Sequence, residues 1–278
     1  MAEITAEMVR ELREATNVGM MECKRALVEA GGDKDKAVKL LRERGMAIAA
    51  KKASRATNQG LIEAIVLQNG SIGALIEVNC ETDFVARNDN FKAFVKELAE
   101  KAAATDAALA DSVQAQVTAR ITEIGENIVF RRNIRYTVQG KGLVATYVHL
   151  GGKVGVLLEV GCEKDETAGK EGFREIVKDL TLHVAASNPK YLDRSGVPAD
   201  VVASEREIYA KQVEGKPVQI ISKIVDGKMN KFYQQTCFVE QGFVKDPDQT
   251  VTQVLEATGK PLSDKLVIRR FTRYQLGE

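Results

Sequence analysis

The sequence predicts an α+β protein with an N-terminal three-helix bundle, a duplicated ββα core with antiparallel sheets, and a protruding antiparallel helical hairpin. Three observations support this class. Apolar residues in 4–53 follow a helical period broken by glycines. Residues 60–104 align with 142–186 without a gap, and Asn69-Gly70 joins two strand-like runs. With 278 residues, of which 44% are hydrophobic, the chain can form about two folded domains.

The first predicted unit is the bundle, residues 1–54. Asp33 is the predicted N-cap of its third helix, and glycines end the helices, with Gly45 as the last stop. The apolar faces of the three helices contain Met8, Val9, Leu12, Met20, Cys23, Leu27, Ala37, Leu40 and Leu41.

Residues 46–59 are expected to form a linker. Two interpretations of its basic residues stay open: Lys51, Lys52 and Arg55 contact RNA, or they are simply solvated, as charge runs commonly are.

The core follows as two copies, in domains 55–140 and 141–278. About 18 of the 45 aligned residues are identical between 60–104 and 142–186. Each copy reads as two strands and a helix. The first helix is expected to bury Phe91, Phe94, Val95, Leu98 and Ala102, with Asn88 or Asp89 as N-cap.

The segments outside the aligned copies add further elements. A helix of about 20 residues and a strand near Ile128–Tyr136 are predicted between them. The helical hairpin is predicted at about 187–229, and residues 236–244 are expected to form a strand before a short helix and a last strand. A basic patch or a solvated strand face is expected at Arg131, Arg132, Arg135 and Lys141.

Composition limits the classes of function. Formal net charge is +1, which argues against a protein that depends on wrapping nucleic acid. Four scattered cysteines without a secretion signal indicate reduced thiols, and no run of 18 apolar residues exists. We therefore expect a cytoplasmic protein with no membrane association and no stable nucleic-acid partner.

No sequence motif for catalysis is present. The chain lacks a phosphate-binding loop, a dinucleotide fingerprint and a nucleophile elbow. His149 and His183 do not have metal-ligand spacing. We expect His149 to be a contact or surface residue, His183 to lie at a core edge, and the protein to have no catalytic residue, metal or cofactor.

The segment "ETDFVARND", residues 81–89, stands out because Phe84 and Val85 have polar counterparts in the second copy, "KDETAGKE". The connection between strand and helix therefore does not need them. Two interpretations stay open: Phe84 packs inside the fold, back onto its own helix or under the N-terminal bundle, or it is an aromatic anchor for a partner.

Several segments together resemble the elongation factor Ts family over nearly the whole chain. They are the N-terminal "LREATNVGMMECKRALVEAGG", the linker "AAKKASR", and the motifs "EVNCETDFVARND", "IGENI" and "HVAASNP". The resemblance implies a ubiquitin-associated-like bundle. It also implies a guanine-nucleotide exchange factor that binds elongation factor Tu, GDP-bound or nucleotide-free, and promotes GDP release by disturbing its Mg²⁺ site and phosphate loop.

The resemblance also implies which residues bind the partner. The segment that dislocates Mg²⁺ from Tu maps to Thr82, Asp83, Phe84 and Val85. Further contacts map to Arg13, Met20, Met21, Lys24, Ile124, Gly125, His149 and Val244. Met20 also lies on the predicted apolar stripe, so Met21 is the stronger candidate of the two. The family's C-terminal helix, which some members carry, is expected to be absent or replaced, and a dimer of two Ts–Tu pairs is allowed.

Two competing hypotheses belong to other classes. One is an RNA-binding translation accessory protein that uses the basic residues of the linker and of the 131–141 stretch. The other is an enzyme with an unrecognised site around His149.

Overall fold

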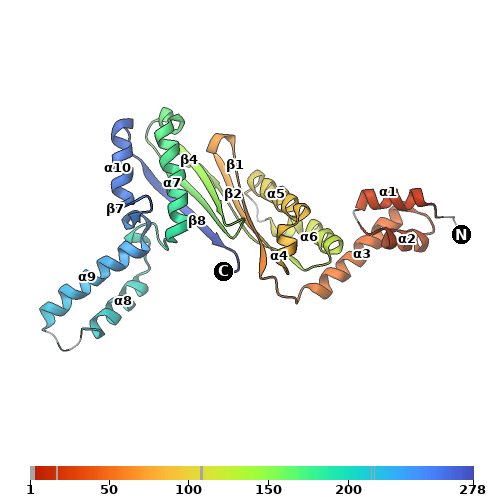
Figure 1. Cartoon of the computed structure of the whole chain (residues 1–278), viewed down its shortest axis with the longest axis horizontal. Helices are drawn as coiled ribbons and strands as arrows, with labels where there is room; N and C mark the ends of the chain where they lie inside the picture. Colours follow the sequence, from red (N-terminus) through yellow and green to blue (C-terminus); the bar gives the residue numbers. More distant parts are fainter. Residues whose placement is uncertain (1–3, 17, 107–108, 214, 216) are drawn as a thin grey trace. The chain divides into compact units, whose positions relative to one another are not determined.

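The computed structural model describes residues 4–16, 18–106, 109–213, 215 and 217–278. It is a mixed α+β structure with N-terminal helices and several small antiparallel sheets with helices, which confirms the class at this level (Figure 1). Its contacts divide the chain into two units. The first contains Met1–Glu63, Ile76–Ile134 and Leu276–Glu278, and the second contains Ala64–Leu75 and Arg135–Gln275.

Three helices begin the first unit: α1 (Ala6–Thr16), α2 (Met20–Glu29) and α3 (Lys34–Lys52). The Asp33 side chain accepts a hydrogen bond from Lys36 N, which confirms the predicted N-cap. Met20 was expected in the core but is 51% exposed, because its side chain falls outside the face that α2 turns inward. The buried core of these helices contains Val9, Leu12, Cys23, Ala26, Leu27, Ala37 and Leu41.

The predicted stop at Gly45 is wrong. Gly45 is buried inside α3, which continues to Lys52 through the first half of the predicted linker. The reason is close packing: α3 contacts α6 (Ala110–Ile124), and a Cβ on Gly45 would lie 3.0 Å from Thr122 Oγ1. The alanine-rich segment that follows favours a helix, so the absent side chain allows a close approach and does not end the helix.

Two three-stranded sheets form the core. Their orders are β1-β2-β3 and β4-β5-β8, and the β4–β5 and β5–β8 pairs are antiparallel. Every residue of β5 is buried, as are eight of the nine in β2. The strands are β1 (Gln59–Leu67), β2 (Ile72–Cys80), β3 (Ile128–Thr137), β4 (Gly142–His149), β5 (Val154–Gly161) and β8 (Val267–Gln275).

Helices cover these sheets. In the first copy α5 (Asp89–Ala104) buries all five residues predicted for its apolar face, and the Asn88 side chain caps it. In the second copy α7 (Glu171–Ser187) packs on β4 and β5 (Figure 1). Short 3₁₀ segments lie at Gln68–Gly70, Asp165–Gly169, Arg194–Gly196 and Phe238–Glu240, and a five-residue helix, α4, at Asp83–Arg87.

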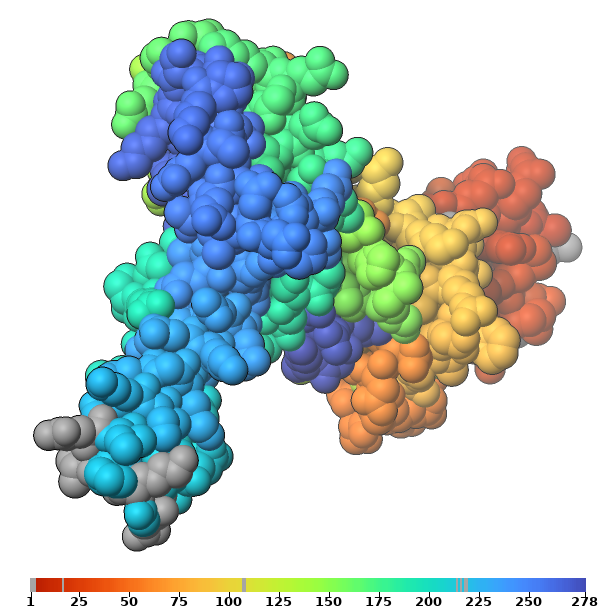
Figure 2. Space-filling model, turned by 60° about the vertical axis from the view of Figure 1, so that its left-hand side comes forward, coloured from red at the N-terminus to blue at the C-terminus, as the bar shows by residue number. Residues whose placement is uncertain are grey.

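The second unit also contains a helical pair, α8 (Ala199–Lys211) and α9 (Val218–Thr236). The two helices pack on each other, side by side and away from the sheet of the same unit (Figures 1 and 2). They begin and end later than the predicted 187–229. The elements β6 (Gly242–Phe243), β7 (Asp246–Thr250) and α10 (Val251–Leu262) follow.

The predicted strand at 236–244 is wrong. Its residues form a 3₁₀ turn and the two-residue strand β6. Tertiary contacts decide this, because Phe238 is fully buried and the N–H groups of Phe238 and Val239 donate to the carbonyls of Tyr191 and Leu192. These backbone N–H groups are already hydrogen-bonded to a neighbouring loop, so they do not need to pair with another strand.

The third strands are also duplicated, at a shift of 138 residues. The stretch "RRNIRY", 131–136, becomes "RRFTRY", 269–274. In both copies a glutamate at 0% exposure on the central strand meets the arginine pair of the third strand. Glu77 Oε2 lies 2.7 Å from Arg132 Nε, and Glu159 Oε2 lies 2.7 Å from Arg270 Nε. Such buried carboxylates need this pairing, because an unpaired buried charge is costly.

The residues after the third strands complete this arrangement. Gln139 N donates to Glu159 Oε1 at 2.6 Å, and Gly277 N donates to Glu77 Oε1 at 3.3 Å. Each buried glutamate therefore accepts an N–H from the segment that follows the other copy's third strand.

In each copy a glycine at or next to the start of the first strand has an unusual backbone angle. Gly142 has φ 149°, and a Cβ there would lie 2.2 Å from Val160 O, while Gly60 makes the same close approach to Val78 O. Gly172, in the first turn of α7, has no atom within 4 Å of such a Cβ.

We expect Gly142→Ala to lower the free energy of unfolding by about 1–3 kcal/mol, because this backbone conformation is essentially restricted to glycine. The matched variant Gly172→Ala is expected to raise it by up to about 1 kcal/mol through helix propensity. Urea unfolding measures both, and equal effects of the two variants would contradict the close approach.

Candidate functional site

The segment after β2 turns sharply into α4. Thr82 is the N-cap, and its Oγ1 accepts a hydrogen bond from Val85 N at 3.3 Å. The Cys80 thiol donates to Thr82 O at 3.2 Å, so both sides of the threonine are bonded locally. This geometry sets the direction in which the first turn of α4 presents its side chains.

A carboxylate from the "IGENI" motif fixes the same turn. Glu126 Oε2 accepts the N–H groups of Glu81 at 3.1 Å and Thr82 at 3.0 Å, and its Oε1 accepts the Thr82 hydroxyl at 2.6 Å. Three donors on one carboxylate are a strong, charge-assisted anchor. The two motifs, 44 and 45 residues apart in sequence, therefore form one structure.

The next residue ties the anchor to the segment after α3. Asn127 N donates to Glu81 Oε1 at 2.6 Å, and Asn127 Nδ2 donates to Arg55 O at 2.9 Å. Lys52 also donates to Gly125 O, and Arg55 lies 3.5 Å from Glu81 Oε1. Two of the three basic residues of the predicted linker, Lys52 and Arg55, thus have partners inside the fold, which does not favour the interpretation of the linker as an RNA-binding surface.

On this frame Phe84 points to solvent. Its side chain is 82% exposed, so it does not pack inside the fold, and the partner-anchor interpretation is the one that remains. Asp83 lies beside it and pairs with Arg87 at 3.0 Å, while Val85 is half-buried and Ala86 is buried. An isolated exposed aromatic on a fixed short helix suits insertion into a pocket of another protein.

The second copy has the same anchor without the aromatic. Asp264, the counterpart of Glu126 at the shift of 138, accepts the N–H groups of Glu163 and Lys164 and the hydroxyl of Thr167. Desolvation opposes ionisation, but these hydrogen bonds outweigh it and lower the pKa of Asp264 to about 2. The counterpart of Phe84 is Glu166, which is also exposed. Both copies therefore have this carboxylate anchor, and only the first copy has an exposed aromatic on the segment that it holds.

The remaining predicted contact residues lie on several surfaces. Met21 is 65% exposed on α2, where Lys24 is also exposed, and Arg13 is exposed in the last turn of α1. Ile124 ends α6, and Gly125 follows it in the left-handed conformation at φ 83°. His149 ends β4, where Tyr147 Oη lies 2.8 Å from its Nδ1.

Val244 lies in the β6–β7 turn of the second unit and is 41% exposed. The imidazole of His183, on α7, holds this turn: its Nδ1 accepts the N–H of Val244 at 3.1 Å, and Nε2 bonds Gln241 Oε1 at 2.9 Å. The ring is fully buried and stacks on Phe238 and Phe243. Burial lowers the pKa of His183, so the bonded, neutral ring is favoured.

Three basic residues of the stretch 131–141 also have ion-pair partners. Arg131 and Arg132 pair with Glu77, and Lys141 lies 3.0 Å from Asp165. These ion pairs occupy the charges within the fold, which does not favour their interpretation as an RNA-binding patch.

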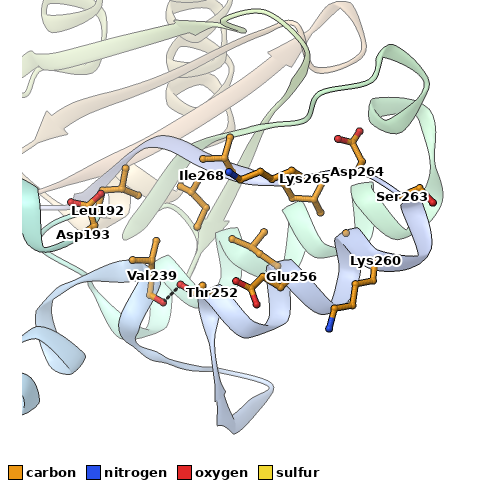
Figure 3. A pocket seen from close by; sticks show the side chains of 14 residues that line it. Leu192, Asp193, Val239, Thr252, Glu256, Lys260, Ser263, Asp264, Lys265 and Ile268 are labelled. Atoms are coloured by element: carbon orange, nitrogen blue, oxygen red, sulfur yellow. Dashed lines mark hydrogen bonds between the residues drawn. The ribbon is translucent and has the colours of Figure 1, made fainter.

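One pocket of about 610 Å³ lies between α10 and the start of β8 (Figure 3). Its wall is mainly apolar, and two of its polar side chains have partners within the fold: Thr252 Oγ1 donates to Val239 O, and Asp264 holds the loop described above. Among the described residues no group of three metal-binding side chains occurs, and no helix there is long and apolar enough to cross a membrane.

Known proteins are similar to this chain over almost its whole length. The family profile described as "Elongation factor TS" matches residues 81–278. The chain belongs to the elongation factor Ts family. An Elongation factor Ts of Trichlorobacter lovleyi is 44% identical over 290 residues, covering 99% of this chain and 93% of that protein. One of Nitratidesulfovibrio vulgaris is 44% identical over 277 residues, covering 99% and 96%, and one of Clostridium botulinum is 40% identical, covering 99% and 93%.

Members of this family are nucleotide exchange factors for elongation factor Tu in translation elongation, and not enzymes. An exchange factor works through contacts, which is consistent with a site made of an exposed aromatic and its support. The residues that sequence analysis missed are the supports Glu126 and Asn127. The motif "IGENI" contained them, and the shift of 138 that relates Glu126 to Asp264 was the signal that would have identified the carboxylate.

We expect Glu126→Ala to lower the free energy of unfolding by about 1–3 kcal/mol, because three partly buried donors lose their acceptor. Hydrogen exchange is expected to increase at the amides of Glu81, Thr82 and Val85. The control is Glu123→Ala, which removes an exposed carboxylate from the last turn of α6 together with its ion pair to Arg120. Unchanged protection at these amides in Glu126→Ala would show that the carboxylate is not the anchor.

We expect stability to fall as pH drops below about 6.5, the ordinary pKa of histidine, towards the lower pKa of folded His183. The unfolded chain binds a proton in this window that the folded chain excludes. Urea unfolding at pH 7.5 and 5.5 measures the difference. His183→Gln is expected to reduce it; the same pH difference in His183→Gln and in the wild type would contradict this assignment.

Proposed function

We propose that the chain accelerates GDP release from elongation factor Tu by inserting Phe84 into an apolar pocket of the GTPase and placing Asp83 near its bound Mg²⁺. The observation that carries this proposal is the 82% exposed Phe84 on a turn anchored by Glu126. A GTPase holds its nucleotide partly through Mg²⁺ and the phosphate loop, so a wedge that displaces these groups weakens the nucleotide.

The energetics require no bond chemistry. The protein must bind nucleotide-free Tu more tightly than nucleotide-bound Tu, and by linkage the nucleotide weakens this binding by the same factor. Every tenfold loss of nucleotide affinity needs about 1.4 kcal/mol of differential binding. A pre-positioned Phe84 reduces the cost of ordering on contact, which leaves more of the contact energy for displacing the nucleotide.

The other contacts form a second part of the proposal. The ubiquitin-associated-like helical bundle docks on Tu through Arg13, Met20, Met21 and Lys24, whose side chains are exposed on α1 and α2. The remaining contacts are Thr82, Val85, Ile124, Gly125, His149 and Val244. The expected location is the cytoplasm, and a dimer of two Ts–Tu pairs is compatible with this arrangement.

We expect Phe84→Ala to reduce the acceleration of GDP release about 30-fold or more, as loss of a hot-spot residue of about 2 kcal/mol implies. The free energy of unfolding should change by no more than about 0.5 kcal/mol, because the side chain is exposed. Stopped-flow release of fluorescent GDP from Tu measures the first quantity and urea unfolding the second.

The control is the reciprocal variant Glu166→Phe, which adds an aromatic to the equivalent position of the second copy. It should leave the rate unchanged. Full activity of Phe84→Ala would refute the wedge, and a wild-type protein that fails to accelerate release would refute the exchange mechanism itself.

A further inference from the structure

The turn between β4 and β5 contains an exposed residue in a conformation that does not suit it. Leu150 has φ 50° and is 68% exposed. Positive φ is an outlier for a bulky side chain without a local hydrogen-bonding group. Because the leucine is exposed in the free protein, no burial of its side chain compensates for this unfavourable backbone conformation. An observed backbone outlier of this kind points to a functional constraint.

The first copy shows what this turn requires. Its counterpart of Leu150 is Gln68, which also has φ 50°. Asn69 and Gly70 follow Gln68 at φ 56° and 98°, and Gly151 and Gly152 follow Leu150 at φ 62° and 92°. The two turns therefore have the same run of positive φ angles. A polar residue occupies the first position in one copy, so the conformation alone does not require leucine.

The two copies differ in the same way at Phe84 and Glu166. In each comparison, one copy has a large exposed apolar side chain where the other has a polar one at the aligned position. Leu150 also follows His149 directly, and the Tyr147 hydroxyl at 2.8 Å holds the His149 ring at the end of β4. The turn is thus tied to a paired strand end and presents its leucine outward.

We propose that Leu150 is an additional apolar anchor for elongation factor Tu, seated in a depression of the Tu surface beside the contact of His149. This inference rests on the proposed function, and continuity with His149 favours Tu as the occupant. Because burying a leucine side chain is worth roughly a tenfold change in affinity or more, the anchor compensates on binding for the unfavourable backbone.

The proposal predicts opposite signs for stability and affinity. Leu150→Asn places a residue that tolerates positive φ in the turn, so the urea midpoint of the free protein should rise. The same variant should bind nucleotide-free Tu about tenfold or more weakly in calorimetry and should accelerate GDP release less. The matched control Gln68→Asn should leave both Tu measurements at their wild-type values.

The outcomes separate this inference from the proposed function. Wild-type protein that neither binds Tu nor accelerates GDP release overturns both. An active wild type with unchanged Tu affinity in Leu150→Asn overturns the anchor alone, as does a lowered urea midpoint with normal affinity. A change confined to self-association in sedimentation would assign Leu150 to contact with a second copy of the chain and also overturn the proposal.

Discussion

The carboxylate of Glu126 is the interaction on which the candidate site depends. It accepts two backbone N–H groups and one hydroxyl in the turn after β2, and that hydroxyl belongs to the residue that caps α4. Phe84 is exposed, so packing does not hold it; its position comes from the backbone beneath it. An exposed anchor binds more tightly when its backbone is already ordered, because less conformational entropy is then lost on binding. Here the carboxylate orders that backbone within the fold.

The duplication explains how such a support arose without being specific to the site. Both copies have a buried glutamate on the central strand and an arginine pair on the third strand. In both, a second carboxylate accepts hydrogen bonds from the loop that follows the central strand. These features satisfy buried polar groups and belong to the architecture. The proposed partner contacts lie where the copies differ in sequence, at Phe84 against Glu166 and at Leu150 against Gln68.

This arrangement suits an exchange factor. Such a protein changes the affinity of its partner for a nucleotide, and its whole effect is a difference between binding energies. Chemistry-bearing side chains are unnecessary, while rigid presentation is essential. The pairing of Asp83 with Arg87, the turn held by His183, and the bonds of Asn127 to the segment after α3 all restrict surfaces that are themselves exposed.

The sequence by itself determined the α+β class, the duplication, most helix and strand positions and the unusual character of residues 82–85, because periodicity, turn residues and repeats are local signals. It could not decide whether Phe84 was buried, why Gly45 occurs, or which groups support the site. Gly45 looked like a stop and proved to be a close helix contact, and Met20 looked like core and proved to be exposed. Only the tertiary structure decided these points, because they depend on residues distant in sequence: Thr122 beside Gly45, and Glu126 beneath Thr82.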